Sequence, residues 1–249
     1  MKGRGTLLLC LASGFSLILA SCGIPEYAYL APPVLESIQQ SPPVFRFSHD
    51  ASNNDTEMFL GYEIYYKFYN PMLDYAQLNV LLGGDYAAIS AASPSSMDSV
   101  LVSRGYHRMD GIAGGQIEIG QKPVLRIDPA DKDTAFVVTL GVPDIGGIPD
   151  VNGGLVAQWA GTPGGEVTLL RNQALLGSDG DETFAKADID LSPRDADVPD
   201  GLESYIGVTL PMGIAVVSYG INLETFTQVY STEIMIQDAA QLLEVAIDN

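Results

Sequence analysis

The run at residues 57–69, EMFLGYEIYYKFY, constrains the fold more than any other stretch of this chain. Its even-numbered positions are all apolar or aromatic: Met58, Leu60, Tyr62, Ile64, Tyr66 and Phe68. This alternation indicates a strand with one face in a core. The odd-numbered face mixes Glu63 and Lys67 with Tyr65 and Tyr69, and we expect it to point outward.

In the rest of the chain, glycines and prolines separate short segments, as is typical of an all-β protein. The 249 residues include 26 glycines and 15 prolines, and short β-rich runs recur between them. These runs read PVFRFSH, PVLRID, TAFVVTLGV, GEVTLLRN, YIGVTL, GIAVVSY and QVYSTEIMI. Helical spacing is found only at the end, where Ile236, Ala240, Leu243 and Ile247 share one side of QDAAQLLEVAID. We therefore expect an all-β fold with a short C-terminal helix that covers a sheet edge or end.

Several of these runs resemble the first and last strands of a fibronectin type III domain. They are PPVLESI, FRFSHD and GYEIYYKFY near the start, and GIAVVSYGINLETFTQVYSTEIMI near the end. Such sandwich domains have about 100 residues, whereas the matching ends lie at about residues 34 and 236 of this chain. The resemblance implies a fibronectin type III-like β-sandwich over residues 34–249, with a large loop-rich insertion at about 83–200.

The first residues have the pattern of an export signal. Lys2 and Arg4 precede an uncharged stretch from Thr6 to Ala20. This stretch is shorter than the roughly 20 residues that a membrane-spanning helix needs. It ends in Leu19, Ala20, Ser21 and Cys22, which resembles the lipobox of bacterial lipoproteins. We expect residues 1–21 to be a lipoprotein signal peptide.

The lipobox implies that the Cys22 thiol carries a diacylglyceryl group and becomes the new N-terminus. The other cysteine, Cys10, lies inside the signal. The alternative is an ordinary secretory signal, which would leave Cys22 as a free thiol. Residues 22–33 hold the lipidated cysteine and a proline-rich tether, and residues 23–33 would extend roughly 35 Å at about 3.1 Å per residue. The alternative is that Tyr27, Tyr29 and Leu30 pack back onto the domain.

The lipobox, GIPEYAYLAPP and FLGYEIYYKFY together resemble uncharacterised spirochaetal, especially treponemal, lipoproteins. That resemblance implies a cell-envelope location, anchored by lipid on the far side of the cytoplasmic membrane, at the periplasmic or outer-surface face. It implies no known activity. The membrane and an envelope or host protein are the expected partners.

The charge of the chain argues against two kinds of partner. With 31 acidic and 12 basic residues, the formal charge is −19. Nucleic acid requires a basic footprint, and electrostatic docking on anionic lipid does too. We therefore expect no nucleic-acid partner, and attachment to the membrane through the lipid alone.

Sequence patterns of catalysis are missing. The chain has no GxSxG, HExxH, P-loop or GxGxxG pattern, and His49 and His107 have no ligand-spaced partners. We therefore expect a protein that is not an enzyme. Because a catalytic triad needs no local pattern, and clustered carboxylates can split their pKa values, an envelope hydrolase stays an alternative.

Two groups of residues are candidates for ligand binding. Tyr65, Tyr69 and Trp159 could stack on a sugar ring, or they could pack beneath the insertion and cap the core. Arg104 and Arg108, in RGYHRM, could receive a carboxylate or phosphate. The alternative is that these arginines pair with neighbouring acids.

The acidic segment at residues 179–203 is a candidate for calcium binding. Asp179, Asp181 and Glu182 surround a glycine in SDGDE, and hard divalent cations prefer such oxygens. The EF-hand spacing is not met, so the alternative is a solvated acidic loop. We expect no other cofactor.

These observations favour a lipid-anchored envelope protein that acts as a non-enzymatic interaction or structural module. A lipoprotein that binds a small ligand or carbohydrate is the second hypothesis, and the hydrolase is the third. A concave aromatic pocket would favour the second, and a buried pair of acids would favour the third.

Overall fold

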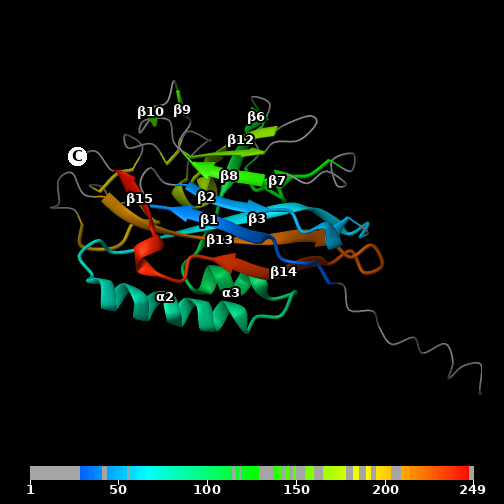
Figure 1. The fold of residues 1–249 in the computed structure, drawn as a ribbon, viewed down its shortest axis with the longest axis horizontal. Helices are drawn as coiled ribbons and strands as arrows, with labels where there is room; N and C mark the ends of the chain where they lie inside the picture. Colours follow the sequence, from blue (N-terminus) through cyan, green and yellow to red (C-terminus); the bar gives the residue numbers. More distant parts are fainter. Residues whose placement is uncertain are drawn as a thin grey trace, which may run out of the picture.

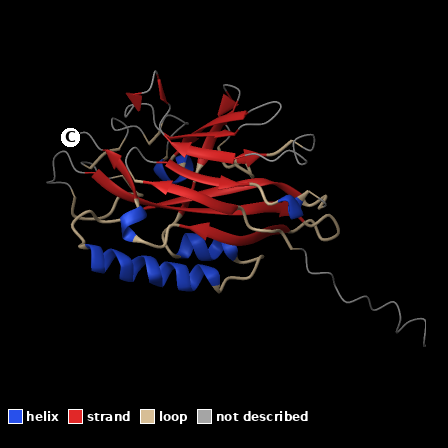
Figure 2. Ribbon diagram, in the orientation of Figure 1, coloured by secondary structure: helices blue, strands red, loops and turns tan. Residues whose placement is uncertain are grey.

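Two antiparallel sheets and a layer of helices make up the fold in the computed structural model (Figure 1). The structure describes residues 29–40, 44–54, 56–113, 116–117, 119–128, 137–141, 144–145, 148–149, 155–159, 165–177, 182–184, 189–191, 195–202 and 209–246. The sheets stack on each other, and the two longest helices lie on the outer face of one sheet (Figure 2). The expectation of a mostly β protein with antiparallel sheets is confirmed.

The first sheet has seven strands in the described residues, in the order β1-β2-β8-β11-β12-β5-β6. Their bounds are β1 (Val34–Gln39), β2 (Val44–Ser48), β5 (Asp110–Ala113), β6 (Gln116–Ile117), β8 (Val137–Gly141), β11 (Leu155–Trp159) and β12 (Gly165–Leu170). Five of these strands come from the segment that was expected as an insertion at about 83–200. That segment therefore builds most of this sheet.

The second sheet has the order β14-β13-β3-β4, with β15 paired to β13 and β7 paired to β3. Its strands are β3 (Phe59–Phe68), β4 (His107–Arg108), β7 (Leu125–Arg126), β13 (Thr209–Ile221), β14 (Gln228–Met235) and β15 (Leu243–Ala246). Strands β9 (Asp144–Ile145) and β10 (Ile148–Pro149) form a separate small pair. The helices are α2 (Tyr75–Ser90), α3 (Met97–Ser103) and α4 (Gln173–Leu176), with the 3₁₀ turns η1 (Ala51–Asn53) and η3 (Ala239–Gln241).

The main core lies between the sheets, and β3 supplies its centre. Tyr62, Ile64 and Tyr66 are fully buried there, as the alternation predicts, and they meet Phe45 and Phe47 of β2. At the start of β3, the even-numbered residue no longer faces this core. Phe59 faces this core, whereas Leu60 packs against the helices, so the pattern predicts the wrong face for Leu60.

Gly61 causes this change of face. The pairing of β3 with β13 shifts between Tyr219 and Gly220, opposite Gly61 and Phe59. Gly61 has a φ of 151°, and a Cβ there would overlap the carbonyl oxygen of Leu125. The bulge needs both a positive φ and a close backbone approach, which glycine alone tolerates.

The odd-numbered face of β3 is also buried, so the expectation that it points outward is wrong. Tyr65 is fully buried and donates a hydrogen bond to Asp98 of α3, and Tyr69 is almost fully buried and donates one to Asp85 of α2. A second core forms here from both helices and from β13 and β14. The helices were missed because the exposed part of α2 carries apolar residues too, and a helix that is apolar all round has no amphipathic period.

The expected C-terminal helix is wrong. In the described part of QDAAQLLEVAID, which ends at Ala246, only Ala239–Gln241 makes a helical turn, and Leu243–Ala246 pairs with β13 as β15. Leu243 and Val245 are buried and Glu244 between them is exposed, which is the period of a strand. The free edge of β13 provides hydrogen bonds that outweigh the helical spacing.

Candidate functional site

The position of α2 is determined by its caps and by one buried acid. Asp74 and Gln77 form a capping box at the N-terminus of the helix, with hydrogen bonds of 2.8 and 2.9 Å. Near the C-terminus, Asp85 points at the sheet and is 1% exposed. Its carboxylate pairs with Lys67 of β3 at 2.6 Å and with Arg104, beyond α3, at 2.7 Å. These contacts join α2, α3 and the sheet.

Tyrosines complete the polar layer between helices and sheet. The Tyr69 hydroxyl donates to Asp85 at 3.0 Å and lies 3.1 Å from the Tyr106 hydroxyl. Tyr65 donates to Asp98 of α3 at 2.6 Å. Burying these hydroxyls is favourable only because each has a partner.

A second buried acid, Glu63, lies on the same face of β3. It is fully buried, its carboxylate lies 3.5 Å from the Arg108 guanidinium, and neither oxygen has a hydrogen bond in the described part of the chain. Burial raises the pKa of Glu63 to about 7, and the positive charge of Arg108 opposes the shift. Arg108 also pairs with Asp110 at 2.7 Å.

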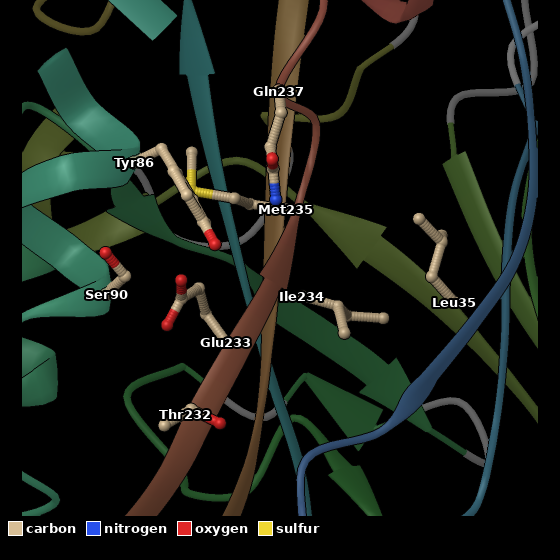
Figure 3. Close-up of a pocket in the computed structure, with 8 residues that line it drawn as sticks. All are labelled: Leu35, Tyr86, Ser90, Thr232, Glu233, Ile234, Met235 and Gln237. Carbon is tan, nitrogen blue, oxygen red and sulfur yellow. The ribbon is translucent and has the colours of Figure 1, made fainter. Parts of the chain in front are cut away.

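A groove runs between α2 and strand β14, and we name it the α2–β14 groove (Figure 3). Its volume is about 440 Å³. The lining residues come from three elements and the turn after β14: Leu35 of β1, Tyr86 and Ser90 of α2, Thr232, Glu233, Ile234 and Met235 of β14, and Gln237. Glu233 and Met235 point toward α2, whereas Ile234 points toward Leu35.

Glu233 is the charged residue that lines this groove. Its side chain is half-buried, and Oε2 is buried with no hydrogen-bond partner among the described residues. Burial raises the pKa of Glu233 above its usual range, and a hydrogen bond from its own backbone N–H opposes the shift. A buried carboxylate oxygen without a donor favours a ligand that supplies one.

The outer surface of α2 borders the groove and carries no charge. Asp85 is the only charged residue of the helix, and it is buried. Val80 is 75% exposed and Tyr75 is 59% exposed. An added Cβ at Gly83 would meet no atom within 4 Å, so the described fold does not require glycine there. In so acidic a protein, this uncharged apolar surface is a candidate for an interaction site.

The aromatic residues proposed for sugar stacking do not come together. Tyr65 and Tyr69 are buried, and their hydroxyls bond to Asp98 of α3 and Asp85 of α2. Trp159 lies on the first sheet and packs against the other core, with its ring across Gly165 of the neighbouring strand. Within the described residues, these three side chains form no concave pocket.

Arg104 and Arg108 have acidic partners within the protein. Arg104 binds Asp85, and Arg108 binds Glu63 and Asp110. Arg108 also donates to the carbonyl of Gln121 at 2.7 Å. These contacts use the guanidinium groups to join strands and helices.

The acidic segment is described only in part. Asp179 and Asp181 lie outside the described residues, whereas Glu182 lies 3.5 Å from the fully buried Arg171. Arg171 also binds Asp195 at 2.8 Å and Asp197. Across the described ranges, no group of three or more His, Cys, Asp or Glu side chains is arranged to hold a metal ion.

The lipidation site, Cys22, also lies outside the described residues. In the part of the chain that is described, no helix has the length and apolar character needed to cross a membrane.

The groove residues were missed from the sequence. Glu233 is the only acid in the strand run QVYSTEIMI, and a lone acid in such a strand is a usable signal. The capping pattern of Asp74 and Gln77 was another, because it predicts a helix start. The contribution of Leu35 could not be found, because it comes from the other sheet.

Comparisons with protein-family models, with curated proteins and with solved structures find no match to this chain.

Proposed function

We propose that this protein is a lipid-anchored cell-envelope protein that binds another protein through the α2–β14 groove and the adjoining surface of α2. The observation that carries the proposal is the uncharged outer face of α2 in a chain with a formal charge of −19. Charged surfaces keep proteins soluble and apart. The uncharged surface of α2 and the adjoining α2–β14 groove are therefore suited to burial against a partner protein.

The anchor rests on the sequence. Leu19, Ala20, Ser21 and Cys22 form the lipobox pattern, and a diacylated Cys22 supplies the two chains that stable anchoring requires. Leu30 and Ala31 are buried in the domain, so the tether expected at residues 22–33 is shortened to the residues before Leu30, which would hold the domain off the bilayer. Such a module meets an envelope or host protein, and its acidity disfavours nucleic acid.

We also propose that the fold is a fibronectin type III-like sandwich. Sandwiches of this class place strands A, B and E in one sheet and C, F and G in the other. The orders β1-β2-β8 and β3-β13-β14 agree with this arrangement when β8 is taken as strand E. The remaining strands of the first sheet are then additions to it.

Binding of a small ligand is the second candidate. The volume of about 440 Å³ lies in the usual range for such sites, and Glu233 offers one polar contact. The protein partner is preferred because the uncharged surface continues beyond the groove along α2.

Acylation tests the anchor. We expect the wild-type protein in its native host to incorporate a labelled fatty acid and to stay with the membrane. Cys22→Ala should lose the label and enter the soluble fraction. An unlabelled wild-type protein would contradict the anchor.

Site-specific cross-linking in intact cells tests the interaction. A photo-reactive residue at Val80 should give one discrete cross-linked product, whereas the same residue at the exposed Phe226, in the β13–β14 turn, should not. A product that is equal at both positions, or missing at Val80, would contradict a role for the α2 surface.

A further inference from the structure

We infer that the α2–β14 groove receives an extended segment of the partner protein, which adds as a strand to the free edge of β14 and places a lysine or arginine against Glu233. This inference rests on the proposed function and specifies how the partner binds. Its support is the direction of the β14 backbone, the walls on either side and the charge in the groove.

The outer backbone groups of β14 face the groove. Among the described strands, β14 is the last of its sheet. The N–H of Ile236 donates to the carbonyl of Ile214, and Met235 lies opposite Ala215. Hydrogen-bonded and non-hydrogen-bonded pairs alternate along antiparallel strands. The N–H and C=O groups of Glu233 and Met235 therefore point away from β13. The Glu233 N–H is already hydrogen-bonded to its own carboxylate, so a further strand would pair with the C=O of Glu233 and with the N–H and C=O of Met235.

Among the described residues, the part of the β14 edge without a backbone partner is short and begins after Tyr230. At Tyr230 the outward N–H donates to the carbonyl of Pro94, in the connection between α2 and α3. The edge from Thr232 to Met235 borders the groove instead. Four residues of strand span about 13 Å, which suits a short segment and excludes a whole sheet.

The groove has walls on both sides of the edge, as strand addition requires. Tyr86 and Ser90 stand on the side of α2, and Leu35 stands on the side of β1 (Figure 3). Side chains of an added strand alternate between these two sides. The side of Leu35 and Ile234 is apolar, whereas the side of α2 contains Glu233.

The charge of Glu233 determines which side chain of the partner fits the groove. Oε2 of Glu233 is buried and has no hydrogen-bond donor within the described residues. A basic side chain of the partner, on the α2 side, would supply that donor. A second copy of this chain is disfavoured as the partner. Two β14 edges paired across a twofold axis would place both Glu233 carboxylates on the same face of the joined sheet, between two chains of charge −19.

Blocked peptide libraries test the inference. The probes are short peptides of randomised valine, isoleucine, threonine and serine with a fixed central lysine, and matched libraries with a central glutamate. Binding to the purified protein in detergent, with its native N-terminus, is measured by fluorescence anisotropy. We expect binding from the lysine library, loss of binding when alternate backbone nitrogens of its selected peptides are methylated, and slower hydrogen exchange across residues 232–235.

The matched variants are Glu233→Gln and Glu224→Gln, since Glu224 is exposed in the β13–β14 turn. Loss of a charge-assisted hydrogen bond should weaken the selected lysine peptides roughly tenfold or more in Glu233→Gln, with no change in Glu224→Gln. Thermal melts check that both variants are folded.

Three results would overturn strand addition: no binding by any library, equal binding of the methylated peptides, or equal binding of the glutamate library. If the Val80 cross-link persists in any of these cases, the proposed function stands and only the mode of binding is wrong. If the cross-link is missing while the lysine peptides bind, the groove binds strands but the α2 surface is not part of the interface.

Discussion

The two faces of β3 bury their side chains in different ways. Toward the first sheet, Tyr62, Ile64 and Tyr66 meet other apolar and aromatic side chains. Toward the helices, Glu63 and Lys67 are held by Arg108 and Asp85. One strand therefore supports an apolar core on one side and a charged, hydrogen-bonded layer on the other.

This difference shows what each interaction contributes. Apolar burial is the larger stabilising effect, but it has no direction. Ion pairs and hydrogen bonds add little net free energy, but they require particular geometries. The apolar face stabilises the sandwich, and the charged face determines where α2 and α3 lie, and with them the wall of the α2–β14 groove.

The largest expected effect is on the apolar face. Ile64→Ala removes methyl and methylene groups from the main core and should lower the free energy of unfolding by about 2–5 kcal/mol. Denaturant unfolding measures this change. Ile64→Val is the matched control and should cost about 0.5–1.5 kcal/mol. Equal midpoints for the alanine and valine variants would contradict the assignment of Ile64 to the core.

A pH-dependent effect should come from the charged face. Because the pKa of Glu63 is raised from 4.5 to about 7, the folded state binds more protons than the unfolded state between these pH values. The free energy of unfolding therefore falls as pH rises through this window. Glu63→Gln removes that fall, so its stability relative to the wild type should increase by at most about 1.4 kcal/mol per pH unit.

The matched control for this effect is Glu57→Gln, since Glu57 is exposed just before β3. Denaturant unfolding at several pH values between 4.5 and 7 measures both variants. A constant difference between Glu63→Gln and the wild type would show that the buried carboxyl titrates as it does in water.

A smaller effect is expected at Asp85. Asp85→Asn weakens the pairs with Lys67 and Arg104 and should cost about 1–3 kcal/mol. The cost is limited because these cations are 21% and 39% exposed and can reach water. If the two faces are independent, Asp85→Asn and Ile64→Ala should be additive within about 0.5 kcal/mol. Strong non-additivity in a double-mutant cycle would mean that the faces are coupled through β3.

The sequence predicts the sheets better than it predicts the helices. β3 and the β13–β14 hairpin follow from alternation and a short connector, which are local signals. α2 has few of them, because its outer surface is apolar and its only charged residue, Asp85, is buried. The turn and strand at the end of the chain were assigned as a helix because Leu243 fits both periods, and only the free edge of β13 decides between them.

The candidate site was the least predictable part. The alternation predicts that Tyr65 and Tyr69 lie on an outward strand face, where aromatic residues would be exposed, but the helices cover that face. The groove needs Tyr86, Glu233 and Leu35 together, from a helix and from strands of different sheets. No periodicity within one segment reveals such a juxtaposition.

The entry of the chain into the fold has a mechanical consequence. Leu30 is fully buried, and Ala31 exchanges hydrogen bonds of 2.8 and 2.9 Å with the Asn53 side chain, while its carbonyl also accepts from Ser218 at 2.6 Å. β1, which follows directly, is an edge strand that a pulling force could peel from β2 one hydrogen bond at a time. With the proposed anchor at Cys22, tension on the N-terminus would reach the buried contacts of Ala31 first and would pass through Ser218 into β13, a central strand among those described. The proposed anchor would therefore load the domain through these contacts without separating β1, the strand that carries Leu35, from β2.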